Sequence, residues 1–159
     1  MKSFILMLTF LTRIPISYSF SFNSKDFIKG IKYMPVIGLI IGGILYPISY
    51  YGDKMAPIVA SLLIIVGYLI ITGGLHLDGL ADVSDGIFSC RDRDRMFEIM
   101  KDSRIGSFGV IALILYFMSM LALLGYSNPV TILIFPVAGR CFALFVCSIN
   151  EYAKESGMG

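Results

Sequence analysis

Three aspartates follow closely after a long apolar segment, at positions 78, 82 and 85 of "GGLHLDGLADVSDGIFSC". At about 100° per residue, a helix over residues 77–86 would place Asp82 about 40° from Asp78, and Asp85 about 20° away on the other side. The three carboxylates would then share one stripe, where like charges repel each other. Because carboxylate oxygens suit Mg²⁺ or Mn²⁺, the spacing predicts a divalent-cation site. The alternative is a solvated helix end whose aspartates pair with nearby arginines.

Two further residues are chemical outliers. His76 is the only histidine of the chain and would lie about 160° from the aspartate stripe on a continuous helix. It is a candidate for proton transfer, and a histidine at the membrane interface is the alternative. Arg140 interrupts the apolar run "VTILIFPVAGRCFALFVCSI". Since a buried arginine in a membrane span is costly and by default marks function, we expect Arg140 to pair with the acidic cluster or with a substrate phosphate.

The segment "CRDRDRMFEIMKDSRIGSFG" carries polar and apolar residues on opposite helix faces. One face is polar (Arg91, Arg95, Glu98, Asp102) and the other is apolar (Met96, Ile99, Met100). This pattern predicts an amphipathic helix in the membrane interface. Its polar side could supply a second acidic arm and cations for phosphate, or it could only form ion pairs within the helix. The candidate anion-binding residues here are Arg91, Lys101, Ser103 and Arg104.

The composition predicts the elements that must position these residues. Hydrophobic residues make up 57% of the 159 residues, charged residues only 15%, and the mean hydropathy is +0.81. Those values are typical of an integral membrane protein. Four apolar stretches approach the ~20 residues that cross a bilayer. They are 33–51, 56–75, 106–126 and 129–149.

We therefore expect an all-α, polytopic membrane bundle that forms a single domain over residues 1–159. The N-terminal "MKSFILMLTFLTRIPIS" is interpreted as a retained short helix, amphipathic or re-entrant, because no small-residue cleavage site follows its apolar run. The net charge of +2 argues neither for nor against a nucleic-acid partner, but no basic run interleaved with aromatics suggests a nucleic-acid surface, so we expect no nucleic-acid partner.

The basic residues predict the orientation. With four spans, eleven of the thirteen Lys and Arg residues fall on one side of the membrane, Lys54 falls on the other and Arg140 lies within a span. Because positive charge accumulates on the cytoplasmic side, we expect both termini and the aspartate segment in the cytoplasm, and the chain in the cytoplasmic (inner) membrane.

Four segments resemble the cobalamin synthase family, whose activity is that of an adenosylcobinamide-GDP ribazoletransferase. They are "FLTRIPI" at 10–16, "TGGLHLDGLADVSDG" at 72–86, "RMFEIMKDSRIGSFGV" at 95–110 and "FPVAGR" at 135–140. The resemblance implies transfer of the cobinamide phosphate of adenosylcobinamide-GDP to α-ribazole or its 5′-phosphate, with release of GMP. It also implies Mg²⁺ as cofactor, with Mn²⁺ as the alternative.

The resemblance also implies roles for the residues in these segments. Metal ligands would come from Asp78, Asp82, Asp85, Glu98 and Asp102. Substrate contacts would come from Arg13, Arg91, Lys101, Ser103, Arg104 and Arg140. Asp85 or His76 would take the proton of the attacking hydroxyl. Members of the family extend beyond the closing "GMG", so we expect this chain to correspond to the N-terminal portion of the family fold, either as a fragment or completed by oligomerisation.

Two other functions fit the pattern less well. A CDP-alcohol phosphotransferase acting on lipids would use a similar aspartate stripe, but "DGLADVSDG" does not match the Asp-Gly-x-x-Ala-Arg pattern of that family. A non-enzymatic membrane subunit or a cation-coupled transporter would place acids in several spans, whereas seven of the eleven acids fall between residues 78 and 102.

Overall fold

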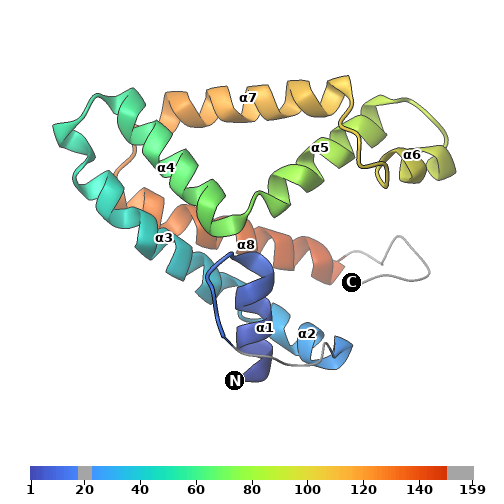
Figure 1. The fold of residues 1–159 in the computed structure, drawn as a ribbon, viewed down its shortest axis with the longest axis horizontal. Coiled ribbons are helices and arrows are strands. Elements are labelled where there is room, and N and C mark those ends of the chain that lie inside the picture. Colours follow the sequence, from blue (N-terminus) through green and yellow to red (C-terminus); the bar gives the residue numbers. More distant parts are fainter. Residues whose placement is uncertain (18–22, 150–159) are drawn as a thin grey trace.

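The computed structural model describes residues 1–17 and 23–149 and is all-helical there, as predicted. The elements in chain order are α1 (Lys2–Leu11), α2 (Ser24–Ile31), α3 (Met34–Tyr50), the 3₁₀ turn η1 (Gly52–Lys54), α4 (Pro57–Thr72), α5 (Leu75–Phe88), α6 (Arg93–Ile99), α7 (Ser107–Leu124) and α8 (Pro129–Ile149). Figure 1 shows α3 and α8 running together, with α4 and α5 forming a V that α7 closes.

Three segments are long and apolar enough to cross a membrane: Met34–Lys54, α7 and α8. The second predicted span, 56–75, is not one continuous helix, because α4 ends at Thr72 and the chain turns by 93° into α5. The bent pair is either a broken span or a re-entrant loop, so the described residues contain three helices long and apolar enough to cross a membrane, or four candidate spans when the pair counts as one. Exposed apolar side chains such as Leu115 and Met118 on α7 fit a lipid-facing surface.

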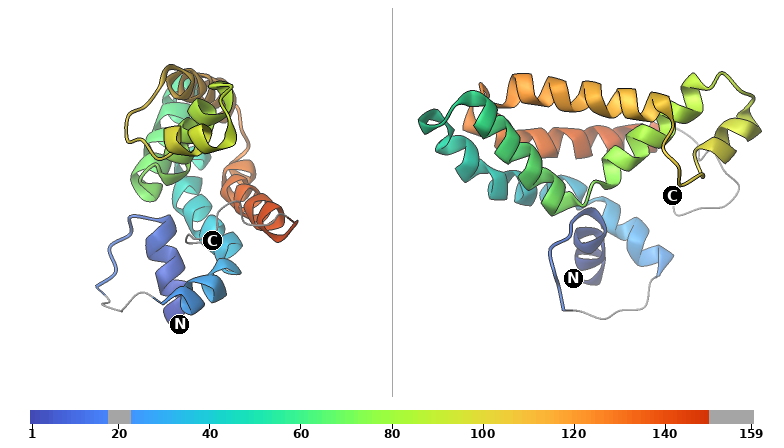
Figure 2. Two further views of the ribbon diagram at one scale, coloured as in Figure 1. Left: turned by 90° about the vertical axis from the view of Figure 1, so that its right-hand side faces the viewer. Right: turned by 45° about the horizontal axis from the view of Figure 1, so that its top comes forward.

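The pair formed by α3 and α8 is the most extensive helix packing among the described residues. Two glycines one turn apart, Gly38 and Gly42, allow this contact. A Cβ built on Gly38 would lie 2.7 Å from the carbonyl oxygen of Pro136, and one built on Gly42 would lie 2.8 Å from the carbonyl carbon of Leu133. Small residues at such positions let helix backbones approach closely in lipid. Both ribbons of the pair are seen side by side in Figure 2.

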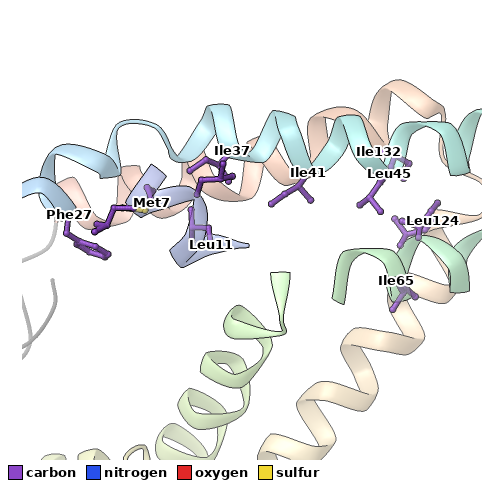
Figure 3. Packing of buried hydrophobic residues seen from close by; sticks show 12 residues of the cluster. Met7, Leu11, Phe27, Ile37, Ile41, Leu45, Ile65, Leu124 and Ile132 are labelled. Carbon is purple, nitrogen blue, oxygen red and sulfur yellow. The ribbon is translucent and has the colours of Figure 1, made fainter. Parts of the chain in front are cut away.

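The buried apolar core follows this pair and extends to the N-terminal helices (Figure 3). Ile37 and Ile41 of α3 are completely buried, and Met7 and Leu11 of α1 lie in the same cluster. The predicted N-terminal helix is therefore present as α1, and it packs on α2, a helix that was not predicted from the sequence.

The amphipathic helix predicted after the aspartate segment is present as α6. Its apolar side faces α5, because a Cβ on Gly86 would meet the side chains of Met96 and Met100 within 3.1 Å. Its polar residues, including Arg95 and Glu98, are exposed. The helix is shorter than predicted, because Arg91 and Asp102 of the predicted polar face lie outside α6. Within α6, the division of polar and apolar residues agrees with the prediction, and its place in a membrane interface stays a prediction.

Candidate functional site

A glycine pair makes the bend between α4 and α5. Gly73 and Gly74 have φ values of +67° and +75°, a left-handed conformation that glycine adopts without the steric penalty of a Cβ. Gly73 ends α4 by donating its N–H to the carbonyl of Leu69 at 2.7 Å, as a glycine does when it ends a helix. The segment after α1 is fixed to the same place, because the Arg13 N–H donates to the carbonyl of Ile71 at 2.6 Å.

A pocket of about 390 Å³ opens beside this bend. It brings Arg13 together with Asp78, two predicted site residues that lie far apart in the sequence. The rest of its lining comes from the bend and α5 (Gly73, Gly74, Leu75, Leu77, Ala81), from the loop before α7 (Ile105) and from the middle of α7 (Leu113, Phe117). One cationic and one anionic side chain on an apolar wall are the kind of lining that orients a charged ligand.

The three aspartates lie on one helix, as predicted, but in different environments. Asp78 is exposed and Asp82 half-buried, whereas Asp85 is buried. Both oxygens of Asp85 accept backbone N–H groups, Oδ2 from Gly106 at 2.7 Å and Oδ1 from Gly109 at 2.9 Å. Asp85 therefore already has partners that Asp78 and Asp82 lack in the hydrogen bonds and ion pairs of the described residues.

No group of three or more His, Cys, Asp or Glu side chains is arranged to hold a metal ion within residues 1–17 and 23–149. Asp78 and Asp82 nevertheless fit Mg²⁺, because this ion is usually held by one or two carboxylates together with water and substrate phosphates. The donor set is thus suited to a metal that arrives with a phosphorylated substrate.

His76 and Arg140 do not line this pocket. His76 is exposed in the first turn of α5. Arg140 is 3% exposed, and its Nη1 donates to the carbonyl of Pro136 at 2.9 Å within α8. Its Nε and Nη2 have no hydrogen-bond partner among the described residues, so the expected pairing with the acidic cluster is not made in this structure.

The remaining predicted residues gather around α6 and the loop that follows, and none of them lines the pocket, to which this loop contributes only Ile105. Glu98 pairs with Arg95, and Asp102 pairs with Arg104 at 2.7 Å. Hydrogen bonds from Arg104 lower the pKa of Asp102 to about 2. The backbone N–H groups of Arg104 and Gly106 donate to the carboxylates of Asp102 and Asp85, so in this structure they are not available to a bound phosphate. The other predicted phosphate contacts, Arg91, Lys101 and Ser103, are exposed.

The bend and the wall contributed by α7 were not predicted from the sequence. The Gly73–Gly74 doublet was a usable signal, because glycine commonly follows the last residue of a helix. Leu113 and Phe117 gave no such signal, since nothing distinguishes them within an apolar span.

Comparison with known proteins identifies the family. A family model described as cobalamin-5-phosphate synthase matches residues 3–159. The chain belongs to the cobalamin-5-phosphate synthase family. No solved structure matches it.

Curated relatives agree with this family. Proteins named adenosylcobinamide-GDP ribazoletransferase from Alkaliphilus oremlandii and Acetivibrio thermocellus are 48% and 44% identical over the whole of this chain. A protein of the same name from Clostridium botulinum (strain Okra / Type B1) is 43% identical. The chain spans 65% to 66% of the length of these relatives.

Proposed function

We propose that this member of the cobalamin-5-phosphate synthase family transfers the cobinamide phosphate of adenosylcobinamide-GDP to α-ribazole or its 5′-phosphate in a Mg²⁺-dependent reaction that releases GMP. The observation that carries the proposal is the pocket that joins Arg13 to Asp78 one helical turn from Asp82. The names of the curated relatives support the substrates. The unequal distribution of basic residues between the two sides of the membrane supports a site that opens to the cytoplasm.

The chemistry is a displacement at phosphorus. The hydroxyl oxygen of the ribazole forms a bond to the cobinamide-linked phosphorus, and the bond from that phosphorus to the bridging oxygen breaks, so GMP leaves with the electron pair. Phosphoryl transfer depends mainly on positioning and charge stabilisation. Bound Mg²⁺, held by Asp78 and Asp82, would supply charge neutralisation at the diphosphate.

The side chains of this chain supply the rest. Arg13 can hold a phosphate oxygen through its guanidinium, whose planar array of donors matches phosphate. The apolar wall from α7 limits access of water to the reacting groups. His76 lies in the first turn of α5 but outside the pocket lining, and it is the candidate proton acceptor if the attacking hydroxyl binds on that side of α5.

A direct assay tests the proposal. The purified chain in detergent is mixed with adenosylcobinamide-GDP, α-ribazole and Mg²⁺, and GMP release is measured, with EDTA and with a CDP-linked lipid as parallel reactions. We expect GMP release that EDTA abolishes, and no CMP from the lipid. Asp82→Asn should lower the rate about 10²-fold or more, as the loss of a group that stabilises transition-state charge does. Asp53→Asn, an exposed carboxylate in η1 outside the site, is the matched control.

Two results would contradict the proposal. One is the absence of GMP from this chain under conditions in which the Alkaliphilus relative releases it. The other is a wild-type rate for Asp82→Asn, which would remove the metal assignment while leaving the reaction in place.

A further inference from the structure

The carboxylate of Asp85 lies between α5 and the first turn of α7. Its two oxygens accept the N–H groups of Gly106 and Gly109, at 2.7 and 2.9 Å. Gly106 is the N-cap residue of α7 and Gly109 is the third residue of that helix. A side-chain oxygen that accepts the N–H of the third helical residue is the usual N-cap arrangement. Here the N-cap residue has no side chain, and the carboxylate comes from a different helix.

The two glycines are required for this contact. A Cβ on Gly109 would lie 2.5 Å from Oδ2 of Asp85 and 3.1 Å from the carbonyl oxygen of Ala81, and a Cβ on Gly106 would also collide with the carboxylate. A Cβ at either position would displace the Asp85 carboxylate or push α7 away from α5, and both changes break the cap. The close approach of the two helices and the cap by Asp85 therefore depend on each other.

The environment of Asp85 differs from that of the other two aspartates of the stripe. Asp85 is 9% exposed and does not line the pocket, whereas Asp78 does. The N-terminus of a helix carries partial positive charge, which stabilises a carboxylate placed there. The start of α7 thus stabilises the charge of Asp85, so only Asp78 and Asp82 are available to bind a cation.

We infer that Asp85 is a positioning residue, which fixes the start of α7 against α5, and that it is neither a metal ligand nor the proton acceptor. Its effect on the site is indirect. Ile105, Leu113 and Phe117 form the α7 side of the pocket, and the cap holds this wall next to Asp78. The part of this inference that concerns metal and substrate rests on the proposed function, whereas the part that concerns the cap does not.

The test compares Asp85→Asn, Gly109→Ala and the double variant with Asp78→Asn, and uses Asp53→Asn as control. Three quantities are measured on the full chain in detergent: the unfolding temperature without metal, amide exchange of residues 104–112 by mass spectrometry, and Mn²⁺ affinity from the electron paramagnetic resonance signal of the free ion. Asparagine keeps the size of Asp85 but presents one amide N–H₂ to a backbone N–H, so it should break half of the cap.

We expect Asp85→Asn and Gly109→Ala each to lower the unfolding temperature by about 2–6 °C. Both should speed amide exchange in the first turn of α7. The unfolding temperature of the double variant should fall by less than the sum of the two single decreases. Both should keep Mn²⁺ affinity within about threefold, whereas Asp78→Asn should weaken it about tenfold or more without a change in the metal-free unfolding temperature. Where GMP release is measurable, Asp85→Asn should raise KM for adenosylcobinamide-GDP and leave the pH dependence of kcat in place.

The opposite pattern would overturn the inference. If Asp85→Asn weakens Mn²⁺ binding as strongly as Asp78→Asn and leaves amide exchange unchanged, Asp85 is a ligand. If it removes the acidic limb of the kcat profile, Asp85 is the base. If no variant, wild type included, binds Mn²⁺, the metal part of the proposed function fails, while unfolding and exchange still decide the cap. Should Asp85→Asn not fold, Gly109→Ala alone tests the contact.

Discussion

The two halves of the bundle differ in how their helices pack. Helices α3 and α8 meet backbone to backbone along their length, with Gly38 and Gly42 at the contact. The V of α4 and α5 packs on α7, and a polar contact lies near each end of α7. Ser61 Oγ donates to the carbonyl of Leu121 at 2.9 Å at one end, and Asp85 caps α7 at the other. Between these contacts lies the 390 Å³ pocket.

This difference indicates how a small membrane bundle can keep a cavity open. Continuous close packing leaves no space for a ligand, so the pair of α3 and α8 serves as scaffold. The V of α4 and α5 also packs on α7, but the bend leaves space between its vertex and the middle of α7. The bend at Gly73 makes the separation, and polar groups at both ends fix it.

The largest effect on stability should come from adding a methyl group at the contact between α3 and α8. Gly42→Ala would place a methyl group against the backbone of Leu133, whereas a methyl group on the next residue, Gly43, would have nothing within 4 Å. We expect Gly42→Ala to lower the free energy of unfolding by about 1–3 kcal/mol, as overpacking does in other cores. Gly43→Ala should be neutral or slightly stabilising. Unfolding by denaturing detergent measures both, and equal effects would mean that the helices do not meet at Gly42.

The bend is the next most sensitive place. Gly73→Ala and Gly74→Ala should each cost about 1–2 kcal/mol, because an L-residue with a Cβ is strained in the left-handed conformation. Only the methyl group at Gly73 would meet the Arg13 side chain, since nothing lies within 4 Å of one at Gly74.

A double-mutant cycle separates the two effects at the bend. In an Arg13→Ala background, Gly73→Ala should cost no more than Gly74→Ala. The free energy of unfolding is measured for each variant. A larger cost for Gly73→Ala in both backgrounds would show that Arg13 does not pack on the bend.

Much of the scaffold could be predicted from the sequence, because apolar length and charge placement identify membrane helices directly. The aspartate stripe could also be predicted, because a helix over residues 77–86 fixes the angles between its side chains. The bend was not predicted. An apolar helix followed by a helix of mixed composition looks continuous unless the Gly73–Gly74 doublet is interpreted as a helix end.

The partners of the charged residues were harder to predict, because they depend on which helices meet. The stripe suggested three equivalent carboxylates, but the approach of α7 gives Asp85 two backbone partners and leaves Asp78 beside Arg13. Arg140 illustrates the same limit. Its burial was predicted from the span, but its bond to Pro136 depends on side-chain geometry within α8.

A smaller effect should come from the other end of α7. Ser61 is completely buried, and Ser61→Ala would remove its bond to the carbonyl of Leu121. We expect a loss of about 0.6 kcal/mol, the average for polar contacts between helices in a membrane protein. Ser119→Ala is the matched control, because that exposed hydroxyl bonds within α7, to the carbonyl of Leu115. If the two variants are equally stable, the contact between α4 and α7 does not depend on Ser61.

The smallest effect should come from the exposed pair in the loop before α7. Bonds from Arg104 lower the pKa of Asp102 from 3.8 to about 2. A lowered folded-state pKa means that the pair stabilises the fold above the ordinary pKa and loses this contribution as the pH falls from 3.8 towards 2. Since both side chains are solvated, Arg104→Ala should leave stability at pH 7 nearly unchanged. A carboxyl-carbon NMR titration should show the pKa of Asp102 rising towards its ordinary value in Arg104→Ala but not in Lys101→Ala. An unchanged pKa in Arg104→Ala would mean that the loop, rather than the arginine, sets the acidity of Asp102.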